Sequence, residues 1–85
     1  MEMSGWPVFA NVCKEAFGAC NFQEKLIEEC GQQPDIAWAA FYHLGDDSIP
    51  WLYRHIPSLD GARPIDLIAS GDADSVRNCL WGFPC

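Results

Sequence analysis

The side chains of this chain that could do chemistry are its cysteines, histidines and serines and a few pairs of acidic residues. The five cysteines are odd in number, lack Cys-x-x-Cys spacing and fall in segments that read as apolar helix faces: Cys13, Cys20, Cys30, Cys79 and Cys85. A reactive thiol needs an exposed, electropositive setting, and this chain is poor in positive charge. We therefore expect reduced thiols buried in a core, with Cys85 as the candidate for an exposed free thiol.

The other candidates are spaced poorly for catalysis. His43 and His55 have no cysteine at ligand spacing, so we expect ordinary surface or half-buried histidines and no metal site. Four serines stand at turns or near helix starts, where a hydroxyl caps a helix: Ser48, Ser58, Ser70 and Ser75. None of them stands in a nucleophile motif. Two acidic pairs also fall at expected helix starts: Asp46 with Asp47, and Asp72 with Asp74. We expect neither enzymatic activity nor a cofactor.

Tryptophan is abundant, with four in 85 residues, and it is enriched both in cores and in binding hot spots. Trp38 and Trp51 fall on segments that must be central, so we expect them in the core. The terminal LWGFPC cannot hide both Trp81 and Phe83 by continuing a helix, because a glycine and a proline interrupt it. This end either folds back onto the core or is presented to a partner, and the sequence leaves both readings open.

Helical spacing of apolar residues predicts the elements of the first half of the chain. A first amphipathic helix opens at Pro7 and reaches Cys20, and a second follows an Asn21 cap and stops at Gly31. A third helix, 36–44, is apolar nearly all round and therefore belongs at the centre.

In the second half, a fourth helix begins near Ser48 and carries apolar residues as far as His55 or Ile56. A loop with an Asp-Gly turn follows over residues 57–63, and then a helix over residues 64–70 that is too short to stand alone. A last helix ends the chain. Since no segment alternates with period two, we expect an all-α fold, a compact single domain of five to six short helices over residues 1–85.

The charge of the chain excludes several partners. Twelve acidic and five basic residues give a net charge of -7, which repels nucleic-acid phosphates and anionic lipids alike. The first residues lack a basic leader and are broken by charges, so we expect a cytoplasmic protein without a membrane span. We expect a protein partner, with a homodimer left open.

A particular order of motifs runs through the second half: Trp51-Leu52, Pro57, Leu59-x-Gly61, Pro64-Ile65-Asp66-Leu67-Ile68, Ser70-Gly71, and Val76 four residues before Leu80. With this order, residues 41–83 resemble the toxin-binding domain of the Xre/MbcA/ParS antitoxin family. The resemblance divides the single domain into N-terminal helices, 1–40, and an antitoxin-like toxin-binding module, 41–85. It also implies that the short helix 64–70 packs between the Trp51 helix and the last helix.

The resemblance implies an all-α inhibitor that neutralises a toxin, usually a RES-type toxin that consumes NAD, by covering its NAD-binding pocket with the C-terminal end. Trp81 and Phe83 fall where that inhibitory end would be. As an exposed polar rim around these apolar anchors we add Arg54, Asp60 and Arg63. Our first hypothesis is therefore a non-catalytic, antitoxin-like inhibitor that binds a partner protein.

A second hypothesis is a phage-type acidic inhibitor, similar to an anti-CRISPR protein, that binds the nucleic-acid-binding surface of a host defence complex. Its acidic face would be Glu24, Glu28 and Glu29 on one side of the second helix, substituting for phosphate. Binding of this kind would collapse as salt rises, whereas an apolar interface would persist. A small enzyme or metal protein ranks last.

Overall fold

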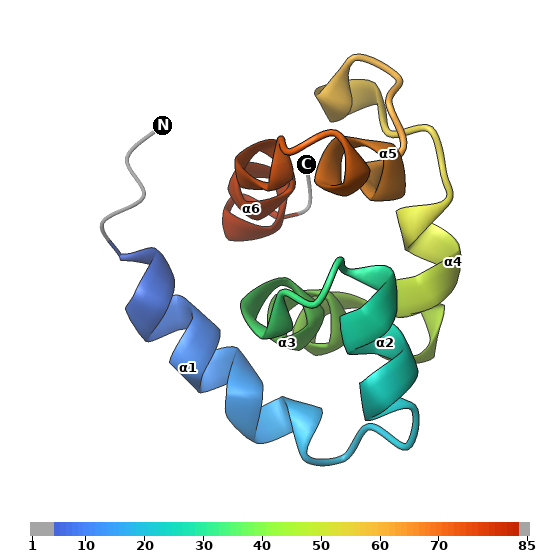
Figure 1. Cartoon of the computed structure of the whole chain (residues 1–85). Helices are drawn as coiled ribbons and strands as arrows, with labels where there is room; N and C mark the ends of the chain where they lie inside the picture. The colour runs from blue at the N-terminus through green and yellow to red at the C-terminus, as the bar shows by residue number, and fades with distance from the viewer. Residues whose placement is uncertain (1–4, 84–85) are drawn as a thin grey trace.

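The computed structural model describes residues 5–83 and is all-α over that range, without a strand, as predicted (Figure 1). Its α-helices are α1 (Trp6–Phe17), α2 (Gln23–Glu29), α3 (Pro34–Leu44), α4 (Ser48–Leu52), α5 (Pro64–Ala69) and α6 (Ala73–Trp81). Two short 3₁₀ helices, η1 (Gly45–Asp47) and η2 (Pro57–Leu59), flank α4. All of them contribute to or pack around one hydrophobic core, so the described residues form a single compact globule.

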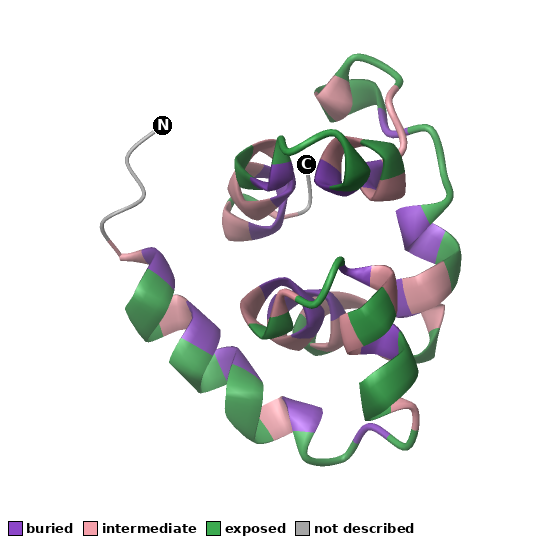
Figure 2. Ribbon diagram, in the orientation of Figure 1, coloured by how far each residue is buried: buried purple, intermediate pink, exposed green. Residues whose placement is uncertain are grey.

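Helix α3 is the central element, as its nearly continuous apolar sequence predicts. Helices α1, α2, α4 and α6 all pack against it. Four of its residues are completely buried: Ile36, Ala37, Ala39 and Ala40. Figure 2 shows the buried residues gathered on the faces that the surrounding helices turn toward α3. Because α3 also crosses the boundary between residues 40 and 41, the N-terminal helices and the expected module share one core.

The tryptophans differ in burial. Trp51 is buried, as predicted, and so is Trp6, which opens α1. Trp38 is half-buried and packs against the core instead of lying within it, so the predicted core position is confirmed only in part. The ammonium of Lys14 on α1 lies over the Trp38 ring, 5.1 Å from its centroid, in a cation–π contact.

The cysteines that the structure describes are buried, which confirms their predicted place in the core. Cys13, Cys20 and Cys30 are free thiols. Burial raises the pKa of Cys13 to about 11 and that of Cys30 to about 12, so both stay protonated and unreactive at neutral pH. Cys79 is also buried, but it is disulfide-bonded, so the expectation of a reduced thiol is wrong there. Cys85 lies outside the described residues.

Helix α2 starts and ends close to its predicted limits. Its N-cap residue is Phe22 rather than Asn21, and no side chain caps its first turn. Beyond its C-terminus, Gly31 has a φ of +68°, and a Cβ there would lie 2.6 Å from Cγ2 of Ile68. Glycine is therefore required for two reasons: the left-handed backbone and the close approach of α5.

Helix α4 is shorter than predicted. It ends at Leu52, so His55 lies in the following segment and is exposed, whereas Ile56 is buried without being helical. The expected capping is also wrong, because no described helix has a side-chain hydrogen bond to its first turn. The hydroxyl of the fully buried Ser48 instead donates back to the carbonyl of Gly45 at 2.6 Å.

The loop that joins α4 to α5 is held by its own backbone. The N–H of Ile56 donates to the carbonyl of Ala62 at 3.1 Å, and the N–H of Gly61 donates to the carbonyl of Ile56 at 3.0 Å. Asp60 and Gly61 have φ values of 56° and 78°, the left-handed conformation that an Asp-Gly turn favours. The short helix α5 then packs against both α4 and α6, which confirms its predicted place between them.

Candidate partner-binding site

The C-terminal end of the described chain folds back onto the helices that precede it. Trp81 and Phe83 are both half-buried. The Trp81 ring meets the rings of Phe9 and Trp6 edge-on, with centroids 5.1 and 6.4 Å away. Gly5 makes room for it, because a Cβ at that position would lie 2.9 Å from Cη2 of Trp81. The start of α1 therefore fixes the position of the Trp81 ring.

His43 fixes the position of Phe83. The two rings stack with centroids 4.7 Å apart and an interplanar angle of 23°. Nε2 of His43 lies 3.0 Å from the carbonyl oxygen of Leu80, so this nitrogen carries the proton and donates it. Burial lowers the pKa of His43, although the hydrogen bond to Leu80 opposes the shift. The ring is therefore neutral at pH 7.

These contacts join α1, α3 and the end of α6 into one half-exposed surface, which we call the aromatic surface. Phe9 lies 6.1 Å from Tyr42 and 5.7 Å from His43, centroid to centroid. Tyr42 is 49% exposed, and none of the rings is fully buried. The members are Phe9, Tyr42, His43, Trp81 and Phe83. Aromatic side chains held in this way are typical of the energetic centres of protein interfaces.

Exposed aliphatic residues continue this surface along α1. Val8 is 70% exposed and Val12 is 51% exposed, and they occupy positions on either side of Phe9 in the helix. They are one turn apart, so they lie on one face of α1. The apolar area available to a partner therefore extends from the C-terminal end of α6 onto α1.

Sequence reasoning identified Trp81 and Phe83 but not their companions. Phe9 and Tyr42 fall within the predicted first and third helices without standing out there, and His43 was expected to be an ordinary surface or half-buried histidine. No local pattern marks these three, because their contact with the C-terminal end depends on how α1 and α6 pack on α3.

Two residues of the predicted polar rim, Arg54 and Arg63, form ion pairs of their own. The guanidinium of the exposed Arg54 donates to both carboxylate oxygens of Asp47, at 2.6 and 3.0 Å. That of Arg63 donates to both oxygens of Asp66, at 2.8 and 3.0 Å. Neither pair includes a member of the aromatic surface. Asp60 is exposed in the loop before α5.

The acidic face on α2 is smaller than the sequence indicates. Glu24 and Glu28 are exposed. Glu29 is half-buried: it accepts a hydrogen bond of 2.8 Å from the hydroxyl of Tyr53 and lies 3.8 Å from the ammonium of Lys25. Of these three glutamates, only Glu24 and Glu28 have carboxylates without a hydrogen bond or ion pair to another described residue.

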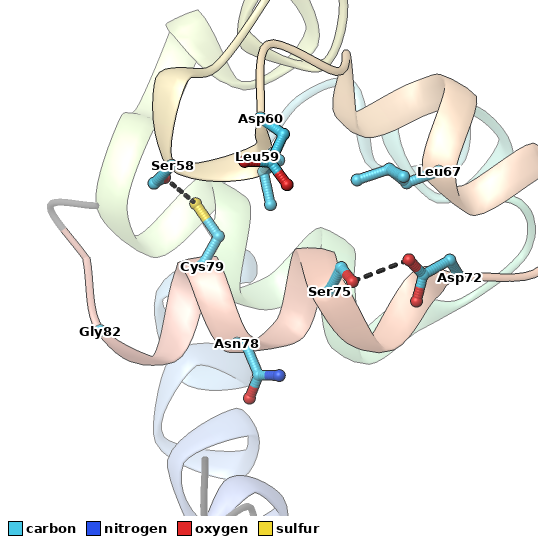
Figure 3. Close-up of a pocket in the computed structure, with 9 residues that line it drawn as sticks. All are labelled: Ser58, Leu59, Asp60, Leu67, Asp72, Ser75, Asn78, Cys79 and Gly82. Carbon is cyan, nitrogen blue, oxygen red and sulfur yellow. Dashed lines mark hydrogen bonds between the residues drawn. The ribbon is translucent and has the colours of Figure 1, made fainter.

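A groove of about 450 Å³ runs between the loop before α5 and helix α6 (Figure 3). We call it the α6 groove, and its lining residues are Ser58, Leu59, Asp60, Leu67, Asp72, Ser75, Asn78, Cys79 and Gly82. Figure 3 shows the side chains of Leu59 and Leu67 pointing into the space between the loop and α6. Asp60 stands on the loop and Asp72 at the start of α6, so both walls carry a carboxylate.

Asp35 lies in a half-buried network that joins α1, α3 and α6. Nε1 of Trp6 and Nε of Arg77 each donate to Oδ2 of Asp35 at 2.8 Å. Arg77 also donates to Asp74 at 2.9 Å and to the side-chain oxygen of Gln33. Burial by itself would raise the pKa of Asp35, but the hydrogen bonds from Arg77 and Trp6 outweigh it and hold this pKa below its usual value. The network stabilises the fold.

Comparisons with models of known protein families, with curated proteins and with solved structures found no significant match to this chain. The resemblance to antitoxins therefore stays a prediction. Within residues 5–83, no three side chains of His, Cys, Asp or Glu gather as potential ligands of one metal ion. No helix in the same range has both the length and the hydrophobicity needed to cross a membrane.

Proposed function

We propose that this protein is a non-catalytic, antitoxin-like inhibitor that binds a partner protein through the aromatic surface and neutralises it. The observation that carries the proposal is the continuous group of rings at the C-terminal end of α6, half-exposed yet held by mutual contacts. Rings that are already immobilised lose little conformational entropy when a partner covers them. Such a surface is suited to tight, stoichiometric binding.

The partner class comes from the resemblance. In the antitoxin family the C-terminal end covers the NAD-binding pocket of a RES-type toxin, and in this chain that end carries Trp81 and Phe83. A net charge of -7 is complementary to a pocket that accepts the phosphates of NAD. We therefore propose a RES-type, NAD-consuming toxin as the partner, bound in the cytoplasm.

Tyr42→Ala is the sharpest test of the aromatic surface, because replacing the packed rings of Trp81 or Phe83 would also destabilise the fold. Tyr42 is 49% exposed, and the matched control Tyr53→Ala removes a 43% exposed tyrosine that lies outside the surface. In pull-downs from the native host at low and high salt, we expect Tyr42→Ala to reduce partner capture about tenfold and Tyr53→Ala to leave it unchanged. Mass spectrometry then identifies the partner.

The same experiment has outcomes that would overturn the proposal. Equal capture by the wild type and Tyr42→Ala would show that the partner binds elsewhere. If the retained protein is not an NAD-consuming enzyme, the assignment of the partner fails while the binding surface stands. Circular dichroism of both tyrosine variants controls for the fold.

The second candidate, an anti-CRISPR-like inhibitor of a nucleic-acid-binding complex, is favoured by the exposed Glu24 and Glu28 and by the negative charge. It predicts a partner that is retained only at low salt and is lost with Glu24→Gln/Glu28→Gln. The aromatic surface predicts the opposite: capture that persists at high salt and does not depend on these glutamates.

A further inference from the structure

We propose that the α6 groove is a second contact site, which binds an arginine or lysine side chain presented by a basic segment of the partner protein. This inference rests on the proposed function, since it adds the chemistry of the partner to the inhibitor described above. None of the residues that define the aromatic surface lines the groove, although Gly82, which does line it, lies between Trp81 and Phe83 in the chain.

Within residues 5–83, no arginine or lysine forms an ion pair with Asp60 or Asp72. All five basic residues lie in the described range, and four of them form ion pairs with other acidic residues: Arg54 with Asp47, Arg63 with Asp66, Arg77 with Asp35 and Asp74, and Lys25 with Glu29. The fifth, Lys14, lies over the Trp38 ring. Asp60 and Asp72 therefore remain available to a cation from outside.

The groove combines apolar and acidic lining residues, as a long basic side chain requires. Leu59 and Leu67 are half-buried and line the groove together with the two carboxylates. Arginine and lysine place an aliphatic stem on apolar surface while the charged head reaches a polar partner. Hydrogen bonds between a cationic donor and a carboxylate are about twice as strong as those between neutral groups. The arrangement therefore suits a cation with an apolar stem.

The backbone is ordered at both aspartates. Asp60 belongs to the loop that the hydrogen bonds of Ile56 close. Asp72 precedes α6, its N–H donates to the carbonyl of Leu67 at 2.8 Å, and its carboxylate accepts a hydrogen bond of 2.8 Å from Ser75. A site whose backbone is already ordered loses less entropy on binding.

The charge of the chain decides between occupants. A second copy would bring another charge of -7, and nucleic acid would bring phosphates, so the acidic groove repels both. Asn78 does not alter this charge, because its side chain points away from the other lining side chains in Figure 3 and is neutral. A basic protein segment is the occupant that the charge favours.

Nuclear magnetic resonance with a defined probe tests the proposal without the partner. The probe is an acetylated and amidated Gly-Arg-Gly-Arg-Gly peptide, titrated into the ¹⁵N-labelled full chain, with Gly-Glu-Gly-Glu-Gly as the control peptide. We expect the arginine peptide to shift the amide signals of residues 58–61 and 72–79, and the glutamate peptide to shift none of them.

A pair of charge-matched variants separates the groove from general attraction to an acidic protein. Asp60→Asn/Asp72→Asn removes two charges but keeps the backbone, because asparagine tolerates the left-handed conformation of residue 60 and is common at helix starts. Glu24→Gln/Glu28→Gln removes the same charge from α2. We expect the first variant to raise the Kd of the arginine peptide about tenfold and the second to change it less than about twofold.

Several results would overturn the inference. Equal weakening by both variants, or peptide-induced shifts centred on α2, would show nonspecific attraction. The same shifts on concentrating the protein alone would place a second copy in the groove. A negative peptide titration would not contradict the proposed function, because Tyr42→Ala tests the aromatic surface separately. Conversely, a pull-down in which Tyr42→Ala has no effect would not change the interpretation of the peptide titration.

Discussion

Asp35 and Asp60 show two different fates of an aspartate in this small acidic protein. Asp35 is half-buried and accepts hydrogen bonds from Trp6 and Arg77, so its charge is compensated within the fold. Asp60 is exposed, stands at the edge of a groove and has no arginine or lysine partner in the chain. An aspartate whose hydrogen bonds are satisfied internally stabilises the structure, whereas one that is left uncompensated on an ordered backbone is available to a partner.

Removing the cation from the Asp35 network should have the largest effect on stability. Arg77→Ala leaves the half-buried carboxylate of Asp35 without its main partner, and we expect the free energy of unfolding to fall by about 2–3 kcal/mol, measured by urea denaturation. The double variant Asp35→Asn/Arg77→Met should lose less than Arg77→Ala, because it removes both charges and keeps the apolar stem. A double variant less stable than Arg77→Ala would contradict this view of the network.

Acid should reveal the same network with a smaller effect. The pKa of Asp35 in the folded protein lies below its usual value of 3.8, so the unfolded chain binds this proton more readily. The stability contributed by the Asp35 carboxylate is therefore complete above about pH 4 and is lost as the pH falls through the folded pKa. Thermal unfolding between pH 6 and pH 2 should show a steeper loss for the wild type than for Asp35→Asn/Arg77→Met.

The groove aspartates should contribute least to stability. We expect Asp60→Asn/Asp72→Asn to change the free energy of unfolding by less than about 0.5 kcal/mol, since both side chains are exposed and asparagine suits both backbone positions. Urea denaturation of this variant and of Arg77→Ala under the same conditions compares their free energies of unfolding. A loss of stability as large as that of Arg77→Ala would show that the groove carboxylates stabilise the fold, as Asp35 does, and are not reserved for a partner.

Much of the fold could be predicted because its signals are local. The apolar run of α3 predicts a buried central helix, and the Asp60-Gly61 turn predicts the loop before α5. The predictions for helix α4 failed in its length and in its capping. Helix α4 stops at Leu52, and Ser48 turns back to Gly45 instead of capping the helix.

The candidate site could be predicted only in part. Trp81 and Phe83 stand out in the sequence because a glycine and a proline interrupt the helix around them. The rings of Phe9 and His43 that hold them come from α1 and α3, and helical periodicity has no information about contacts between separate elements.

The sequence by itself determined the all-α class, the order of the helices, the burial of the four described cysteines and the net negative charge. These properties follow from residue periodicity, turn chemistry and net charge, which are read over a few residues or over the whole composition. Only the tertiary structure decided that the charge of Asp35 is compensated. Arg77 reaches Asp35 across 42 positions of the chain, and a contact over such a separation depends on how α3 and α6 pack together.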